Sequence, residues 1–204
     1  MDNYGNANGR PAIGAADANM RTYRPKLSFY HPNARGTGGV CSLELHPAHD
    51  STDGSIWASF ANQMTVGDMR GPNPTFARFD WENKIVVKLD FNDLTKMLQV
   101  FRGECESVEE GKGLFHRSPK ASTRICLKHL VEPIPGYMLE VFRTGSGGEE
   151  CRARILLAPN EALGLSAAIE ASLGVIAFGI PMVVPHDTAT YRAEVKEMRN
   201  APAA

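Results

Sequence analysis

The chain has 204 residues, of which 43% are hydrophobic and 22% charged, and its formal net charge is −1. This length and composition suit one globular domain, or one domain built from two similar halves, and the balanced charge excludes a bulk attraction for polyanions. A local basic surface is compatible with that balance, because residues 114–131 contain Arg117, Lys120, Arg124 and Lys128 and no acid.

Four short strands are predicted in the first part of the chain, each bounded by turn-forming Gly, Pro, Asn or Asp. They cover 26–33 (KLSFYHPN), 40–47 (VCSLELHP), 55–64 (SIWASFANQM) and 75–90 (TFARFDWENKIVVKLD), the last with a bend at 80–83 (DWEN). In the last segment Ile85, Val87 and Leu89 share one face, while Lys84 and Lys88 share the other. This alternation predicts a half-buried strand with a basic outer face.

A helix is predicted directly after the fourth strand. Asn92 suits its N-cap, and Asp93 suits the positive end of the helix dipole. An apolar stripe at helical spacing follows and consists of Leu94, Met97, Leu98 and Phe101. We expect this helix to end near Gly103.

The same order of elements recurs after an acidic linker at 104–110. Strands are predicted at 113–119 (GLFHRSP), 122–132 (STRICLKHLVE), 136–144 (GYMLEVFRT) and 151–158 (CRARILLA), and a long helix follows with Asn160 as its N-cap. The sequence therefore predicts an α+β fold built from a duplicated ββββα unit. We expect one domain at 23–181 with halves 23–103 and 113–181, flanked by tails at 1–22 and 182–204.

The apolar stretch 162–184 is compatible in length with a membrane span, but it contains Glu170, two serines and three glycines. These residues favour a buried helix of a globular protein. Because apolar residues occupy most of its circumference, the helix needs cover on two sides. We expect a homo-oligomer with helices at its centre and no membrane contact; the alternative is that the first helix alone covers the second.

Motifs for catalysis are absent from the sequence. It has no Gly-x-Ser-x-Gly elbow, no phosphate-binding P-loop and no His-Glu-x-x-His motif, so we expect neither an enzyme nor a cofactor. His46, His49 and Asp50 (HPAHD) are the best candidate for a metal site, but the interpretation as a strand end is favoured over metal binding. The four cysteines form no Cys-x-x-Cys pair and no signal segment precedes them, which predicts reduced thiols and a cytoplasmic location.

Basic residues interleaved with aromatic residues on strands are the pattern that does suggest a function. Lys26 lies close to Phe29 and Tyr30, and Arg78 lies close to Trp81. Cations follow the phosphates of a single-stranded nucleic acid and aromatic faces accept its unstacked bases. The alternative is that these aromatic residues belong to the core and that the strand lysines serve solubility.

Four segments resemble, in the same order, those of a known family. They are YRPKLSF (23–29), FDWENKIVVKLDFNDLTKML (79–98), GLFHRSP (113–119) and LLAPNEALGLSAAI (156–169). The family is that of the Whirly single-stranded DNA-binding proteins, within a wider group of single-stranded DNA-binding regulators and coactivators. The resemblance implies two antiparallel four-stranded sheets packed with helices between them, a tetramer formed through the helices, and binding of single-stranded DNA with little sequence preference. It also places His116 and Pro119 on a family motif.

From these patterns we expect a non-enzymatic protein that binds single-stranded DNA, or RNA, in replication, repair, recombination or transcription. The candidate binding residues are Lys26, Phe29, Tyr30, Arg78, Trp81, Lys84, Lys88, Phe115, His116, Lys120, Arg124 and Lys128. Two alternatives are a protein-interaction or structural oligomer that shares the fold without binding nucleic acid, and a metal-dependent enzyme at the HPAHD segment.

Overall fold

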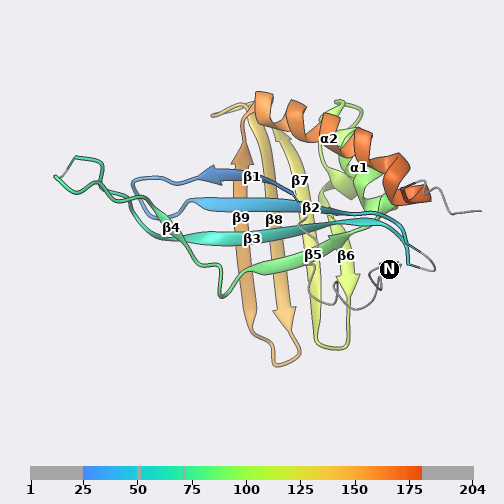
Figure 1. Ribbon diagram of the computed structural model, residues 1–204, viewed down its shortest axis with the longest axis horizontal. Coiled ribbons are helices and arrows are strands. Elements are labelled where there is room, and N and C mark those ends of the chain that lie inside the picture. The colour runs from blue at the N-terminus through green and yellow to red at the C-terminus, as the bar shows by residue number, and fades with distance from the viewer. Residues whose placement is uncertain (1–24, 50–51, 71, 181–204) are drawn as a thin grey trace, which may run out of the picture.

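The computed structural model describes residues 25–49, 52–70 and 72–180, so the predicted tails at 1–22 and 182–204 lie outside the described residues. The first half of the chain forms an antiparallel sheet (Figure 1). Its strands are β1 (Lys26–His31), β2 (Gly39–His46), β3 (Ser55–Thr65), β4 (Arg78–Phe79) and β5 (Ile85–Leu89). The order is β1-β2-β3, and both β4 and β5 pair with β3.

The predicted single strand over 75–90 is therefore two strands. The pairing of β4 with β3 ends at Phe79. The chain then turns through Asp80 and Asn83, and β5 pairs with β3 from Ile85 onward. Asp80 accepts hydrogen bonds from the backbone N and the side-chain amide of Asn83. These bonds lower the pKa of Asp80 and close the turn where the sequence predicts a bend.

The second half forms a four-stranded antiparallel sheet in chain order. Its strands are β6 (Leu114–Arg117), β7 (Ala121–Leu130), β8 (Gly136–Gly145) and β9 (Glu150–Leu157), and a short 3-10 turn (Val108–Gly111) precedes them. In Figure 1 the strands of this sheet cross those of the first. Gly39 of β2 lies so close to β9 that a Cβ atom there would stand 2.1 Å from the backbone O of Arg154, so only glycine fits at this crossing.

Each sheet is followed by a helix, α1 (Phe91–Phe101) after the first and α2 (Pro159–Phe178) after the second. Both begin two residues earlier than predicted. Asp90, not Asn92, caps α1, because its carboxylate accepts a hydrogen bond from Asp93 N (2.9 Å) while Asp93 accepts one from Asp90 N (3.1 Å). At α2 the N-cap is Ala158, whose N–H donates to the Glu161 carboxylate (2.8 Å), and Pro159 occupies the first helical position.

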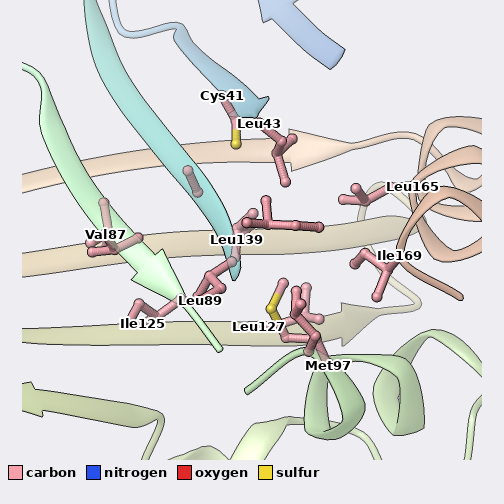
Figure 2. Close-up of a cluster of buried hydrophobic side chains, with 14 of the residues drawn as sticks. Cys41, Leu43, Val87, Leu89, Met97, Ile125, Leu127, Leu139, Leu165 and Ile169 are labelled. Carbon is pink, nitrogen blue, oxygen red and sulfur yellow. The ribbon is translucent and has the colours of Figure 1, made fainter. Parts of the chain in front are cut away.

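One hydrophobic core receives side chains from both helices and from every strand except β4, with β1 adding the partly buried Phe29 (Figure 2). Most of its strand residues come from alternate positions, which is why the alternation in the sequence located the strands. Both helices add side chains to this core, among them Met97 of α1 and Ile169 of α2. Cys41 is fully buried in it, and burial raises the pKa of its thiol. All four cysteines are free in the structure. The predicted fold class, α+β with two antiparallel sheets and helices, is confirmed.

The helix α2 contributes only one face to this core. Its buried residues are Ala162, Leu165, Ser166, Ile169 and Ile176. By length and composition α2 could also cross a membrane, and 22% of its most apolar window is buried in the single chain. The exposed positions follow helical spacing and include Leu163, Gly164, Ala167, Ala171, Gly174 and Phe178. Because these positions stay exposed beside α1, the first helix does not cover them.

Candidate nucleic-acid interface

A row of alternating aromatic and cationic side chains crosses the outer face of the second sheet. In the strand register Phe115 of β6 lies opposite Arg124 of β7, Arg124 opposite Phe142 of β8, and Phe142 opposite Arg152 of β9. The guanidinium carbons of Arg124 and Arg152 lie 4.6 and 5.1 Å from the centre of the Phe142 ring. Since neighbouring strands are about 4.8 Å apart, the backbones that carry Phe115 and Phe142 are about 10 Å apart.

The alternation of side chains along the strands places this row on the outer face of the sheet. In β7 and β8 the odd-numbered residues Ile125, Leu127, Leu139 and Val141 are buried in the core, so the even-numbered ones point outward. Phe115 is 70% exposed. Phe115 therefore offers an exposed flat surface to a base. The half-buried Phe142 ring contacts Arg124 and Arg152, and Arg152 also pairs with Glu140.

A second row crosses the outer face of the first sheet. It runs from Lys26 of β1 through Glu44 of β2 and Trp57 of β3 to Lys88 of β5. Trp57 is 43% exposed, and the ring of His46 stacks on it at 5.4 Å. Lys26 pairs with Glu44 at 3.1 Å. Among the described residues Lys88 has no ion-pair partner, so its charge is available beside the indole.

An aromatic cluster lies at one end of the first sheet. The ring of Tyr30, which is 54% exposed, contacts Phe79 edge-on at 5.5 Å and Trp81 at 6.5 Å. Arg78 is exposed next to Phe79. Edge-to-face packing fixes the orientation of these rings and leaves part of each in contact with water.

A cleft joins the edges of the two sheets at β5 and β6. It has a volume of about 670 Å³, and Lys88, Phe115 and Arg117 are among its lining residues. A smaller hollow of about 200 Å³ continues from it and is lined by Lys88, His116, Arg117 and Arg143. Arg117, like Lys88, has no ion-pair partner in the part of the chain that the structure describes. The cleft as a whole has mixed charge, because Asp53, Asp90, Asp93 and Glu109 also line it, together with Lys96 and Lys112. Lys88 and Arg117 supply its positive charge between the two aromatic rows.

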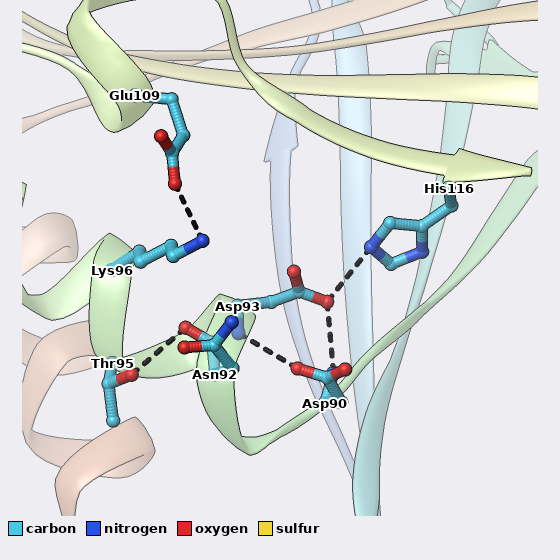
Figure 3. A network of polar contacts seen from close by, with 7 residues as sticks. All are labelled: Asp90, Asn92, Asp93, Thr95, Lys96, Glu109 and His116. Atoms are coloured by element: carbon cyan, nitrogen blue, oxygen red, sulfur yellow. Dashed lines mark hydrogen bonds and ion pairs between the residues drawn. The ribbon is translucent and has the colours of Figure 1, made fainter.

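His116 lies in this cleft but points inward, to the start of α1 (Figure 3). Its Nε2 atom is 2.9 Å from a carboxylate oxygen of Asp93, the residue that also completes the α1 capping box. The hydrogen bond to Asp93 raises the pKa of His116. Close by, Lys96 pairs with Glu109 at 2.6 Å, and this hydrogen bond raises the pKa of the lysine. Because its imidazole is bonded to Asp93, His116 connects β6 to the start of α1.

The structure brings most of the predicted binding residues to one of these surfaces. Lys26 and Lys88 belong to the Trp57 row, Tyr30, Arg78 and Trp81 to the aromatic cluster, and Phe115 and Arg124 to the Phe142 row. Lys84 and Lys120 are exposed in the turns before β5 and β7, and Lys128 is exposed on the outer face of β7. Phe29 faces inward and packs against the core, and His116 pairs with Asp93, so neither presents its ring at the outer faces.

Sequence reasoning missed Trp57, Phe142 and Arg152. In SIWASFANQM the side chain of Trp57 lies on the other face of the strand from those of Ile56 and Ala58, so its outward direction could be predicted from the sequence. The alignment of Phe142 between two arginines could not be, because it depends on the register of three consecutive strands, and the lengths of the two turns that set this register were not fixed by the sequence pattern.

The candidate metal segment has other contacts in the structure. His46 lies 3.0 Å from Glu44 and stacks on Trp57, and Asp50 is outside the described residues. No group of three or more His, Cys, Asp or Glu that could hold a metal occurs within the described ranges.

Comparison with solved structures identifies the architecture. The structure of WHY1 from Arabidopsis thaliana matches with a TM-score of 0.61 and 15% identity, over 90% of this chain and 97% of that one. WHY3 from the same plant matches with a TM-score of 0.58 and 16% identity, over 88% and 98%. No family model and no curated protein sequence matches the chain. The Whirly-like fold predicted from the sequence is thus confirmed, at an identity that establishes the fold alone.

Proposed function

We propose that this protein binds single-stranded nucleic acid, with little sequence preference and without enzymatic activity, in replication, repair, recombination or transcription. The observation that carries the proposal is the row Phe115–Arg124–Phe142–Arg152 on a solvent-exposed sheet face. Arg152 also pairs with Glu140, whereas Arg124 has no ion-pair partner among the described residues. Stacking on bases and contact with phosphates use this combination of an aromatic ring with a cation beside it.

The same row explains why the ligand is single-stranded and why sequence matters little. Every base has a flat face that a phenylalanine ring can stack on, and every nucleotide has a phosphate for an arginine. In a duplex the base faces are already stacked on each other, and proteins that read the grooves present a polar or basic helix. Here both helices are used for the core, and the exposed face of α2 is apolar.

The apolar exposed face of α2 supports assembly into a homo-oligomer, for which we propose a tetramer formed through the helices. Its stripe of Gly164, Ala167, Ala171 and Gly174 has no large side chains, so a second helix can approach closely. Leu163 and Phe178, which are 74% and 89% exposed, lie near the two ends of this stripe. Contact with a second copy removes both from water.

The first test is fluorescence anisotropy of a labelled single strand about 32 bases long, titrated at two salt concentrations and competed with duplex of the same sequence. We expect binding that weakens steeply with salt and that duplex fails to displace. No binding at low salt would overturn the proposal. It would favour the alternative of a protein-interaction oligomer, for which the apolar face of α2 is the supporting observation.

The variant Phe142→Ala tests the row directly. Loss of one stacking platform should weaken binding about tenfold, because a stacked base contributes about 1–3 kcal/mol. Phe142→Tyr keeps the ring and should bind as the wild type does. Since Phe142 lies on the outer face, the thermal midpoint of unfolding should stay within a few degrees. Unchanged affinity of Phe142→Ala would remove this row from the binding surface.

A further inference from the structure

A long hairpin extends the first sheet away from the rest of the molecule (Figure 1). We call residues 64–70 and 72–79 the arm. Its two sides are joined by hydrogen bonds from Thr75 N to Asp68 O (2.7 Å) and from Arg78 N to the hydroxyl of Thr65 (3.1 Å). The arm therefore has a defined backbone, and Figure 1 shows it extending away from the second sheet and the helices.

A buried amide fixes the direction in which the arm leaves the sheet. The side chain of Gln63 is 8% exposed and accepts hydrogen bonds from the backbone N–H groups of Asn33 (2.8 Å) and Gly38 (3.1 Å). Its NH2 group donates to the backbone oxygens of Asn33 (3.0 Å) and Thr65 (3.1 Å). Three bonds from this side chain to the turn between β1 and β2, and one to Thr65 of the arm, thus tie the base of the arm to that turn.

The arm exposes large apolar side chains that serve no core. Phe76 is 78% exposed, Met69 63%, Met64 55% and Val66 49%. An apolar group of this size on a defined hairpin marks a contact surface.

The charge of the arm is positive and arranged next to these side chains. Arg70 follows Met69, and Arg78 lies two residues after Phe76. Asp68 is the arm's one acid among the described residues, and its carboxylate accepts a hydrogen bond from the backbone N of Arg70 (2.9 Å). The pairing of an exposed apolar or aromatic group with a free arginine repeats the composition of the Phe142 row.

The arm also continues the proposed binding surface. Its base carries Phe79, which packs against Tyr30, and Tyr30 packs against Trp81. A strand that stacks on this aromatic cluster reaches the arm without leaving the protein surface.

We propose that the arm is a second contact region for the same single strand, with Phe76 and Met69 packing against bases and Arg70 and Arg78 contacting phosphates. This inference rests on the proposed function and extends the binding surface beyond the two sheets. A second copy of the chain is the less suitable occupant, because contact between two arms brings their arginines together and like charges repel.

The first experiment compares arm variants on long and short strands. On a strand about 32 bases long, Met69→Ala with Phe76→Ala should weaken binding about tenfold, and Arg70→Ala should lower the salt slope by about 0.7. On a strand about 8 bases long, which the sheet faces can hold alone, neither variant should change the affinity. Arg78 is left in place, because it also belongs to the aromatic cluster at the end of the first sheet. Ile134→Ala is the matched control, because Ile134 is 60% exposed in the turn before β8.

The outcomes separate the two proposals. If the arm variants bind the long strand like Ile134→Ala, or change only the oligomeric state measured by light scattering, the arm is not a nucleic-acid contact and the proposed function stands. If the wild type binds neither strand, the proposed function itself fails.

Crosslinking gives a second readout that does not depend on affinity. Arg70 and Arg78 flank the arm's tip, so trypsin releases residues 71–78 (GPNPTFAR) as one peptide that contains Phe76. Ultraviolet crosslinking to a bromodeoxyuridine-substituted strand should modify this peptide and the peptide 129–143, which contains Phe142. Modification of 129–143 without 71–78 would overturn the assignment of the arm.

Discussion

His116 links three parts of the molecule through one side chain. It lies on the edge strand β6, pairs with Asp93 at the start of α1 and lines the cleft between the two sheets. The neighbouring residues Phe115 and Arg117 point to the outer side, so the position of His116 also sets the position of these two candidate binding residues.

The pairing of His116 makes stability depend on pH. Because Asp93 raises the pKa of His116 in the folded state above its usual value of 6.5, the folded protein holds this proton more tightly than the unfolded chain. The stabilisation is complete below about pH 6.5 and is lost as the pH rises through the raised pKa. We expect the wild type to lose more stability than His116→Gln between about pH 6 and pH 8.5. Urea titrations at several pH values measure this difference, and parallel curves for the two proteins would contradict it.

At the scale of elements, alternation and apolar stripes located both helices and all the sheet strands except β4 and β5, which were predicted as one strand. Two kinds of detail were out of reach of the sequence. The helix starts were misplaced because Asn92 and Asn160 are good N-cap residues in isolation, while the fold gives that role to Asp90 and to Ala158 followed by Pro159. The pairing of strands could not be predicted either, because register depends on contacts between residues far apart in the sequence.

The start of α1 provides a test of the structure against the sequence pattern. Asp90→Ala removes the carboxylate that accepts from Asp93 N, and it should lower the free energy of unfolding by about 1 kcal/mol. Asn92→Ala should change it by less than about 0.5 kcal/mol, because Asn92 is exposed within the first turn. Urea denaturation of the two variants measures both values. A larger loss of unfolding free energy for Asn92→Ala than for Asp90→Ala would show that Asn92 is the N-cap, as the sequence pattern predicts.

For the whole molecule, the cleft at β5 and β6 joins two outer faces that otherwise point away from each other. The Trp57 row ends at Lys88, which lines the cleft, and the Phe142 row ends at Phe115, which lines it from the other sheet. The basic face of β5 and the basic segment 114–131 can each be predicted from the sequence. Their meeting at one cleft follows from the way the two sheets cross.

Removing positive charge from the cleft tests whether a bound single strand passes through it from one outer face to the other. Lys88→Ala with Arg117→Ala should weaken binding of a single strand and lower the slope of log affinity against log salt by about 1.4, because each phosphate contact contributes about 0.7. Lys84→Ala with Lys88→Ala should also weaken binding without changing the oligomeric state. Arg102→Ala is the control, since Arg102 pairs with Glu170 on the helices. An unchanged salt slope in the first variant would remove the cleft from the binding path.

Assembly through α2 would place several such surfaces on one particle, and its effect on binding depends on strand length. Ala167→Lys puts a charge into the small-residue stripe at a position that is exposed in the single chain, so only contact with a second copy would bury the charge. We expect this variant to fold, to have a lower mass by light scattering than the wild type, and to bind a short strand with unchanged affinity. A strand long enough to contact two copies should bind at least tenfold more weakly, because the second contact is then no longer intramolecular.

Gln99→Lys adds the same charge to α1 at an exposed position and should leave both mass and affinity unchanged. If Ala167→Lys keeps the wild-type mass, the exposed face of α2 is not the contact between copies.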